Sequence, residues 1–462
     1  MTATVLTPLP DVAELNPRRF TEQPSDSDLV SFVPMKAVEE ESGRLNAAEH
    51  RLWGEVKKGY TAFQNGDVIF AKITPCMENG KFAFASGLHA GRAAGSTEFH
   101  VLRAKPGLDA RYLMHFLFTP EVRRAAKMNM KGAAGQLRVP TQFLEGLRIP
   151  VPSIEQQREA VAYLDEQLSR LDASVTALLR AKANLKRYRA SVLKAACEGR
   201  LVPTEAELAR AEGRTFETGA QLLQRSLAER REYWPRKGKY GEPIAPAAVS
   251  ASELPSHWAW ATVGQLLREP LCNGLSIKGS DSPPGVPALK LNAMSEAGFD
   301  YEQMRYLPIA ESSVADIVIQ AGDHFVSRGN GSLDLVGRGT VAQPAPRPTI
   351  FPDTMIRMRL CALVRDSHWM RLIWSSLWVR GQIERKVKTT AGIYKISQPE
   401  LESIVIPLPS LPEQHRIVTE ADRRLSLIRG AEAQVSANLA RAKRLRQSIL
   451  QAAFAQPGSA GQ

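Results

Sequence analysis

Residues 149–161 read IPVPSIEQQREAV, and residues 406–418 read IPLPSLPEQHRIV, at an offset of 257 positions. The offset still holds farther along, where KRYRASVLKAA at 186–196 matches KRLRQSILQAA at 443–453. Similarity that keeps one register over this length indicates a duplicated structural unit. Weaker matches upstream, such as Gly66-Asp67 with Gly322-Asp323, extend the repeat into the segment before each copy.

Each copy opens a long amphipathic helix. In the first copy, Pro150 and Pro152 end an extended segment, and Ser153 is a candidate N-cap. Apolar residues then recur at alternating steps of four and three, which is the seam of a coiled coil. The seam residues are Leu164, Leu168, Leu171, Val175, Leu178, Leu185 and Val192 in the first helix, and Leu425, Ile428, Val435, Leu439, Ala442 and Ile449 in the second.

Charged residues interrupt both seams, at Lys182 and Arg189 in the first helix and at Glu432 and Arg446 in the second. A helix of about 44 residues is roughly 65 Å long, which exceeds the width of a small domain. Because a whole domain separates the two helices, we expect antiparallel pairing with a domain at each end. The alternative is that each helix packs on its own domain, and helix length argues against it.

The predicted fold is therefore α+β, with two tandem globular domains that are each followed by a long α-helix, and with the two helices pairing as an antiparallel coiled coil. The predicted segments are a first globular domain at 1–150, a long helix at 151–200, a helical piece with a Pro/Gly/Ala linker at 201–253, a second globular domain at 254–408, a second long helix at 409–455, and a flexible tail at 456–462.

Composition narrows the function. The 462 residues include 60 Lys and Arg against 48 Asp and Glu, for a net charge of +12. This excess favours a polyanionic partner, although solubility alone would also explain it. The four cysteines are far apart, and we see neither a signal peptide nor a long apolar run. We therefore expect a cytoplasmic protein with reduced thiols, no metal site and no membrane contact.

Catalytic signatures are missing from the sequence. Gly80-Lys81 is followed by Phe82 and lacks the upstream glycine of a phosphate-binding loop. The eight histidines are scattered, and only Cys76 with His100 is an arguable nucleophile pair, for which a buried cysteine is the simpler interpretation. We predict that the chain has no catalytic residue of its own.

Two loops that recur in both domains carry polar groups suited to base edges or phosphates. The first loop is VIFAKITPCMENGK at 68–81, with HFVSRGNGSLDLVGRG at 324–339 as its counterpart. The second is MKGAAGQLRVP at 130–140, with KTTAGIYKISQ at 388–398. Asn-Gly in the first loop also fits a plain tight turn. The candidate DNA-binding residues are Lys72, Thr74, Asn79, Lys81, Gln136 and Arg138 in the first domain, and Arg328, Asn330, Ser332, Tyr394 and Lys395 in the second.

A third candidate stretch belongs to the second domain alone. It reads NGLSIKGSDSPPGVPALKLNAMS at 273–295 and contributes Lys278, Lys290 and Asn292 as candidate DNA contacts.

These features together resemble one family. The duplication, the I-P-x-P-S starts of both helices, the loops GDVIFAKITPCMENGK and RGNGSLDLVGR, the segment GIYKIS at 392–397, and LPSHWAWATVGQLL at 254–267 are similar to the DNA-specificity subunit of type I restriction–modification systems. The resemblance covers essentially the whole chain, and the combination of motifs carries it.

The resemblance implies a division of labour. Each globular domain would be a target-recognition domain for one part of a bipartite, asymmetric site in double-stranded DNA, and the helices would act as spacer and docking surface. Two methyltransferase subunits would bring S-adenosylmethionine for adenine-N6 methylation, and two restriction/translocase subunits would bring ATP and Mg for DNA cleavage. This chain would bind no cofactor itself.

Other readings stay open from the sequence. The chain would equally serve a fused restriction–methylation enzyme in place of separate subunits. A coiled-coil adaptor whose domains bind proteins would show no salt-dependent DNA affinity, whereas phosphate contacts weaken as salt rises. A self-contained enzyme would transfer methyl groups or cleave DNA alone.

Overall fold

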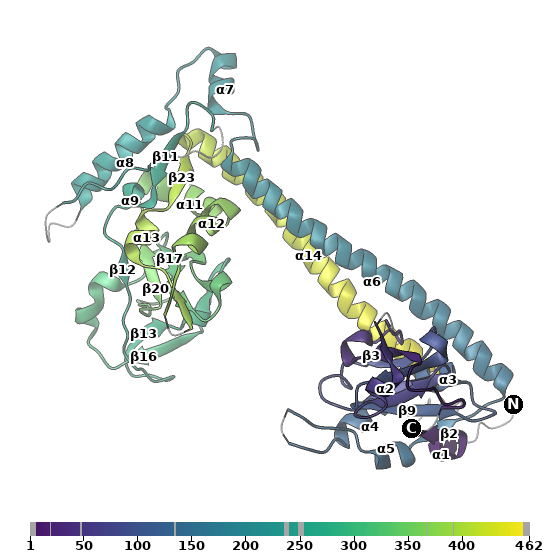
Figure 1. The fold of residues 1–462 in the computed structure, drawn as a ribbon. Helices are drawn as coiled ribbons and strands as arrows, with labels where there is room; N and C mark the ends of the chain where they lie inside the picture. The colour runs from purple at the N-terminus through teal and green to yellow at the C-terminus, as the bar shows by residue number, and fades with distance from the viewer. Residues whose placement is uncertain are drawn as a thin grey trace. The chain divides into compact units, whose positions relative to one another are not determined.

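The computed structural model describes residues 6–18, 20–46, 49–133, 135–234, 240–247, 254–366, 368–390 and 392–455. The fold is mixed α/β with two long helices (Figure 1). Two compact units divide the chain. Unit 1 comprises Met1–Arg180 and Val435–Gln462, and unit 2 comprises Ala181–Gln434. The predicted tail at 456–462 and parts of the predicted linker lie outside the described residues.

Unit 1 is built on two four-stranded sheets, with strand orders β2-β9-β6-β7 and β4-β3-β8-β5. All five residues of β6 are buried, and alternate side chains enter two different apolar clusters, so both faces of this strand are covered. The strands are β1 Leu6–Pro8, β2 Ala13–Leu15, β3 Leu29–Val33, β4 Glu49–Leu52, β5 Thr61–Gln64, β6 Asp67–Ala71, β7 Phe82–Phe84, β8 Arg92–Gly95, β9 Phe99–Ala104 and β10 Arg148–Pro150; the helices are α1 Leu9–Val12, α2 Trp53–Val56, α3 Ala110–Leu117, α4 Pro120–Met128 and α5 Thr141–Glu145.

Unit 2 has one four-stranded sheet of order β12-β20-β17-β19 and several smaller ones. Its strands are β11 Ala259–Thr262, β12 Cys272–Asn273, β13 Val286–Leu289, β14 Met294–Ser295, β15 Gly298–Phe299, β16 Met304–Leu307, β17 His324–Ser327, β18 Gly329–Asn330, β19 Gly339–Val341, β20 Met355–Met358, β21 Lys388–Thr390, β22 Ile393–Lys395 and β23 Val405–Leu408. Its helices are α7 Glu205–Glu212, α8 Gly219–Tyr233, α9 Val263–Leu266, α10 Ala362–Asp366, α11 Trp369–Trp374, α12 Leu377–Lys386 and α13 Gln398–Glu402.

The repeated Gly-Asp motif forms the same ion pair in both units. Asp67 at the start of β6 binds Arg103 of β9 at 2.7 Å, and Asp323 beside β17 binds Arg359 at 2.7 Å. Both aspartates are almost fully buried, and each also accepts a backbone N–H three residues upstream, from Gln64 and Gln320. Breaking a buried pair leaves a desolvated charge, so this device holds the central strand of each sheet in place.

The two long helices are α6, Ile154–Cys197, and α14, Leu411–Phe454. Gln157 and Gln414, one turn into each helix, are fully buried, and each donates its side-chain N–H to a proline carbonyl just before the helix. The glutamine of the repeated helix start is therefore a structural anchor. The two helix starts differ at one equivalent position, which is Gln156 in α6 and Glu413 in α14. Gln156 forms a capping box with Ser153, whereas buried Glu413 accepts hydrogen bonds from His257 and Trp258.

Each unit contains one end of both long helices. In unit 1, Leu164 and Leu168 of α6 share an apolar cluster with Leu450 near the end of α14. In unit 2, Val192 near the end of α6 shares a cluster with Leu425 of α14. The start of one helix thus meets the end of the other within each unit. Every apolar residue assigned to helix pairing is buried or half-buried, namely Leu164, Leu168, Leu171, Val175, Leu178, Leu425, Ile428, Val435, Leu439 and Ile449.

The segment after α6 is more ordered than its composition suggests. Both α7 and α8 begin with capping boxes, at Thr204 and Thr218. The carboxylate of Glu205 is buried and pairs with Arg416 of α14 at 2.7 Å and with Arg214 at 2.6 Å. Residues 201–234 therefore pack as part of unit 2. No helix in the described part of the chain combines the length and apolar character that a bilayer crossing requires.

His324 makes unit 2 sensitive to acid. Burial lowers the pKa of this imidazole to about 3, whereas an unfolded histidine titrates near 6.5. Below pH 6.5 the unfolded chain binds a proton that the folded chain excludes, so stability present at neutral pH falls by about 1.4 kcal/mol per pH unit. We expect the His324→Gln variant to lack this contribution to the pH dependence of the free energy of unfolding.

Urea unfolding at pH 7.5, 6.5 and 5.5, followed by tryptophan fluorescence, checks this expectation. Six of the seven tryptophans lie between 181 and 434, so the signal reports mainly on unit 2. An unchanged pH slope in the variant would contradict it.

Candidate nucleic-acid interface

The two candidate loops of unit 1 lie side by side. The backbone N–H of Thr74 donates to the carbonyl of Leu137 at 2.9 Å, and that of Val139 donates to the carbonyl of Lys72 at 2.8 Å. Ile73 and Arg138 form an isolated antiparallel bridge between them. The structure thus brings Lys72, Thr74, Gln136 and Arg138 into one cluster at the end of β6.

Unit 2 repeats this arrangement. The backbone N–H of Ile396 donates to the carbonyl of Arg328 at 2.9 Å. Strand β18 pairs with β22, placing Gly329 opposite Lys395 and Asn330 opposite Tyr394. Arg328 lies 256 positions after Lys72, and Lys395 lies 257 positions after Arg138. Equivalent basic residues therefore occupy the same place in both units.

Acidic side chains limit the free charge of the unit 1 cluster. The guanidinium of Arg138 binds both carboxylate oxygens of Glu98, at 2.9 to 3.1 Å. These hydrogen bonds lower the pKa of Glu98, so the carboxylate stays charged and orients the guanidinium. Lys72 is half-buried at the end of β6, and Gln136 is exposed. A DNA phosphate would compete with Glu98 for Arg138.

Three further unit 1 candidates, Lys81, Asn79 and Thr74, also have partners within the domain. The ammonium of Lys81 donates to the carbonyl of Val38 at 3.1 Å and lies 3.5 Å from that of Met35. The amide of Asn79 donates to Glu40 at 2.9 Å. The half-buried Lys81 thus holds the loop before β4, which favours a structural role over contact with DNA. Thr74 donates its hydroxyl to the sulfur of Met130 at 3.6 Å.

His100 supports the same cluster from behind. Its Nε2 bonds the carbonyl of Val139 at 2.8 Å, and burial lowers the pKa of the imidazole. Burial also raises the pKa of the Cys76 thiol, opposite to what a nucleophile needs. Within the described ranges, no group of three or more His, Cys, Asp and Glu side chains is arranged to hold a metal.

The third stretch of unit 2 forms one wall of an open cleft of about 440 Å³. Lys278 and Lys290 line it together with Arg305, which the sequence did not single out. Arg305 lies opposite Ala288 in the β13–β16 pair, a register that no local motif reveals. Lys290 pairs with Asp281 at 2.7 Å.

The remaining unit 2 candidates surround this cleft or the neighbouring loop. The guanidinium of Arg328 lies 3.5 Å from the carbonyl of Asp353, a residue that lines the cleft. Asn292 donates to Gln303 at 3.2 Å. Asn330 accepts the backbone N–H of Ser332, and the Ser332 hydroxyl donates to Asp334, so both stabilise a turn.

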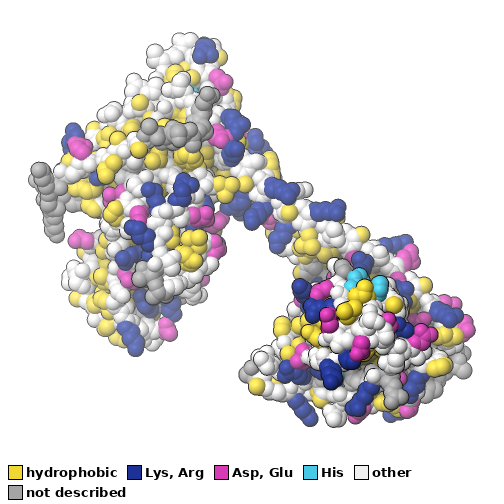
Figure 2. All heavy atoms as spheres, viewed as in Figure 1, with side chains coloured by type: hydrophobic (Ala, Val, Ile, Leu, Met, Phe, Trp, Pro, Cys, Tyr) yellow, Lys and Arg dark blue, Asp and Glu magenta, His cyan; other side chains and the backbone are white. Residues whose placement is uncertain are grey.

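Basic side chains are not gathered on one broad face in the view of Figure 2, where they are interspersed with acidic ones over both units.

Comparisons with known proteins find similarity to DNA-specificity proteins of type I restriction systems. The family described as the type I restriction modification DNA specificity domain matches residues 7–184. The chain is similar to the EcoAI specificity subunit of Escherichia coli, at 24% identity over 90% of this chain and 76% of that protein. It is also similar to the EcoEI specificity subunit of Escherichia coli, at 26% identity over 89% of this chain and 76% of that protein.

One solved structure shares the fold. A chain from work on complex assembly and conformational transition of the type I R-M system matches with a TM-score of 0.60 over 98% of both chains, at 19% identity. The family match, the similar specificity subunits and this shared fold together confirm the resemblance drawn from the sequence.

Lys278 offers a direct test of phosphate contact because it is exposed in the unit 2 cleft. We expect Lys278→Gln to reduce the slope of log affinity against log salt by about 1, because one fewer counterion is released. The measurement is a salt titration of duplex DNA binding by the assembled complex. Arg210→Gln, which removes one exposed charge from α7, is the matched control. Equal slopes for both variants would remove Lys278 from the interface.

Proposed function

Because this chain resembles the DNA-specificity subunits of type I restriction enzymes, we propose that it reads a bipartite, asymmetric DNA target and assembles methyltransferase and restriction subunits on it. The observation that carries the proposal is the pair of equivalent loop clusters, one at the end of β6 and one at the end of β17. Each cluster sits in a different domain, and each domain is followed by one copy of the same helix.

The two clusters favour two different half-sites. Unit 1 presents Lys72, Gln136 and Arg138. Unit 2 presents Arg328 and Lys395 at the places of Lys72 and Arg138, and its Tyr394 lies at the place of Leu137. Arg and Lys suit guanine or phosphate, and Gln suits adenine. Only unit 2 adds the cleft lined by Lys278, Lys290 and Arg305. Different side chains on a common frame account for an asymmetric target.

The paired helices would set the gap between the half-sites. Each helix has 44 residues, which corresponds to roughly 65 Å at the usual helical rise. In unit 1 the start of α6 packs against the end of α14, and in unit 2 the end of α6 packs against the first half of α14. The seam residues between these contacts are also half-buried or buried. These observations support one continuous antiparallel coiled coil that acts as a spacer.

Catalysis would belong to the partners. Two methyltransferase subunits would dock on the helix pair and supply S-adenosylmethionine, and two restriction subunits would supply ATP-driven translocation and cleavage with Mg. An adenine inside a duplex must leave the base stack before its N6 can be methylated. Holding the DNA at two fixed points on either side of the gap would support that distortion. This chain contributes recognition and assembly in the cytoplasm.

The spacer role predicts the effect of helix length. One extra heptad in each helix, after Arg180 and after Gln434, keeps the seam in phase and adds about 10 Å, close to three base pairs. We expect the methylated motif of the assembled complex to keep both half-sites and to gain about three base pairs between them.

The control inserts the same heptad in α6 alone, which puts the two helices out of register and should abolish specific methylation. An unchanged gap in the doubly extended protein, with the complex intact, would contradict the spacer role.

A further inference from the structure

Two arginines lie where the helix seams call for apolar side chains. Arg189 of α6 and Arg446 of α14 are 257 positions apart and therefore occupy the same place in the repeat. Both guanidiniums are largely covered, with side-chain exposures of 27% and 14%. A charge in a seam costs stability unless it is paired, and such residues often fix the register of a coiled coil.

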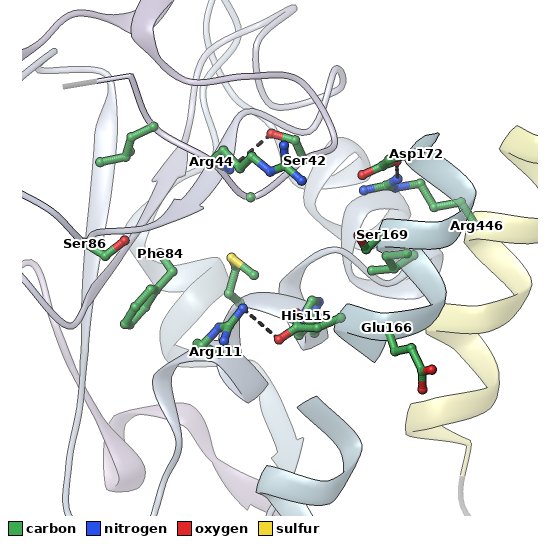
Figure 3. Close-up of a pocket in the computed structure, with 15 residues that line it drawn as sticks. Ser42, Arg44, Phe84, Ser86, Arg111, His115, Glu166, Ser169, Asp172 and Arg446 are labelled. Carbon is green, nitrogen blue, oxygen red and sulfur yellow. Dashed lines mark hydrogen bonds and ion pairs between the residues drawn. The ribbon is translucent and has the colours of Figure 1, made fainter. Parts of the chain in front are cut away.

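Arg446 joins three parts of unit 1. Its Nη1 binds Asp172 of α6 at 2.6 Å, and its Nη2 donates to the backbone carbonyl of Glu41. Asp172 and Arg446 line a cleft of about 780 Å³ together with Ser42 and Arg44 of the first domain. Figure 3 shows these four side chains and the Asp172–Arg446 ion pair. The planar fork of the arginine thus contacts the partner helix and the domain at once.

Residues 40–41 are hydrogen-bonded to the candidate DNA-binding loop at 68–81. The backbone N–H of Glu41 donates to the carbonyl of Gly80 at 3.0 Å. Its neighbour Glu40 accepts the Asn79 hydrogen bond, and Arg123 binds the Glu41 carboxylate at 3.0 Å. A residue of the second helix therefore supports the loop at 68–81 through a single intervening segment.

Arg189 also contacts a segment of the domain, in unit 2. Its Nη2 binds Glu296 at 2.6 Å. Glu296 lies in the turn between β14 and β15, directly after the stretch 273–295 that contributes Lys278 and Lys290. In both units, then, the arginine comes from the helix that follows the other domain. In unit 1 it contacts the segment that is hydrogen-bonded to Asn79 and Gly80, and in unit 2 it contacts the turn that follows the stretch 273–295.

The two contacts are not identical. Asp172 corresponds to Arg429 in the repeat, so the interhelical ion pair of unit 1 has a like-charged counterpart in unit 2. Arg446 therefore ties α6, α14 and the domain together, whereas Arg189 has its ion pair with the domain. Loss of Arg446 should have the larger effect.

We propose that Arg189 and Arg446 are positioning residues that fix the orientation of each recognition domain on the helix pair, and so set how strictly the complex requires one spacer length. This inference rests on the proposed function. It concerns the tolerance for the gap, and it leaves the reading of each half-site unchanged.

Methyl transfer by the assembled complex tests the proposal. Substrates are duplexes that carry both half-sites with the preferred spacer or with a spacer one base pair shorter or longer. We expect Arg446→Met to reduce the preference for the correct spacer at least tenfold and Arg189→Met to reduce it less, while single-base changes within a half-site keep their wild-type effect. The controls are Arg444→Met and Arg187→Met. These two exposed arginines lie two residues before Arg446 and Arg189 on the same helices.

A charge exchange separates positioning from stability. The double variant Asp172→Arg with Arg446→Asp can restore the interhelical ion pair, but an aspartate cannot donate to the Glu41 carbonyl. We expect it to recover the unfolding temperature that Arg446→Met loses, without recovering spacer preference. Recovery of both, or wild-type preference in Arg446→Met, overturns the proposal. If the wild-type complex prefers no spaced target at all, the proposed function itself fails.

Discussion

The apolar seam of a 44-residue helix has to be covered, and the rest of the structure depends on how this chain covers it. Each unit solves the problem with the other repeat's helix, so that Leu164 and Leu168 meet Leu450, and Val192 meets Leu425. At the start of each helix a buried glutamine, Gln157 or Gln414, donates to the carbonyl of the proline just before the helix, and Gln157 also bonds Gly107 and Asp109 of its domain. A domain that is anchored at one helix and contacted by the end of the other has a defined orientation, which the proposed reading of two separated DNA half-sites requires.

A common frame with variable loops follows from the duplication. The buried pairs Asp67–Arg103 and Asp323–Arg359 hold the central strands in the same way. The backbone hydrogen bonds that the carbonyls of Lys72 and Arg328 accept are also equivalent. The side chains that project from this frame differ between the units, as do the strands around them. Under the proposed function, specificity can therefore change at the loops without disturbing the buried charges and strand pairings on which folding depends.

The sequence predicted what depends on period and position along the chain. It located both helices, their seams and the two loop pairs, because these are local patterns repeated at one offset. It did not reveal pairings across the fold. Lys81, a candidate DNA contact, donates to the carbonyl of Val38. Arg305 lines the cleft because of the strand register. Arg446, predicted only as an interruption of the seam, contacts Asp172 and Glu41. Helix α7 was also not predicted, although its capping box at Thr204 is a local signal. Its packing through Glu205 and Arg416 is a long-range contact that the sequence does not reveal.

The most direct measurement is a genome-wide map of adenine methylation in a host that expresses this chain with its methyltransferase partner, compared with the methyltransferase alone. The account predicts a split, asymmetric motif that appears only when this chain is present, with a fixed number of unread bases between its parts. An intact complex that produces no such motif, or a motif that is unchanged when this chain is omitted, would contradict the role in target recognition.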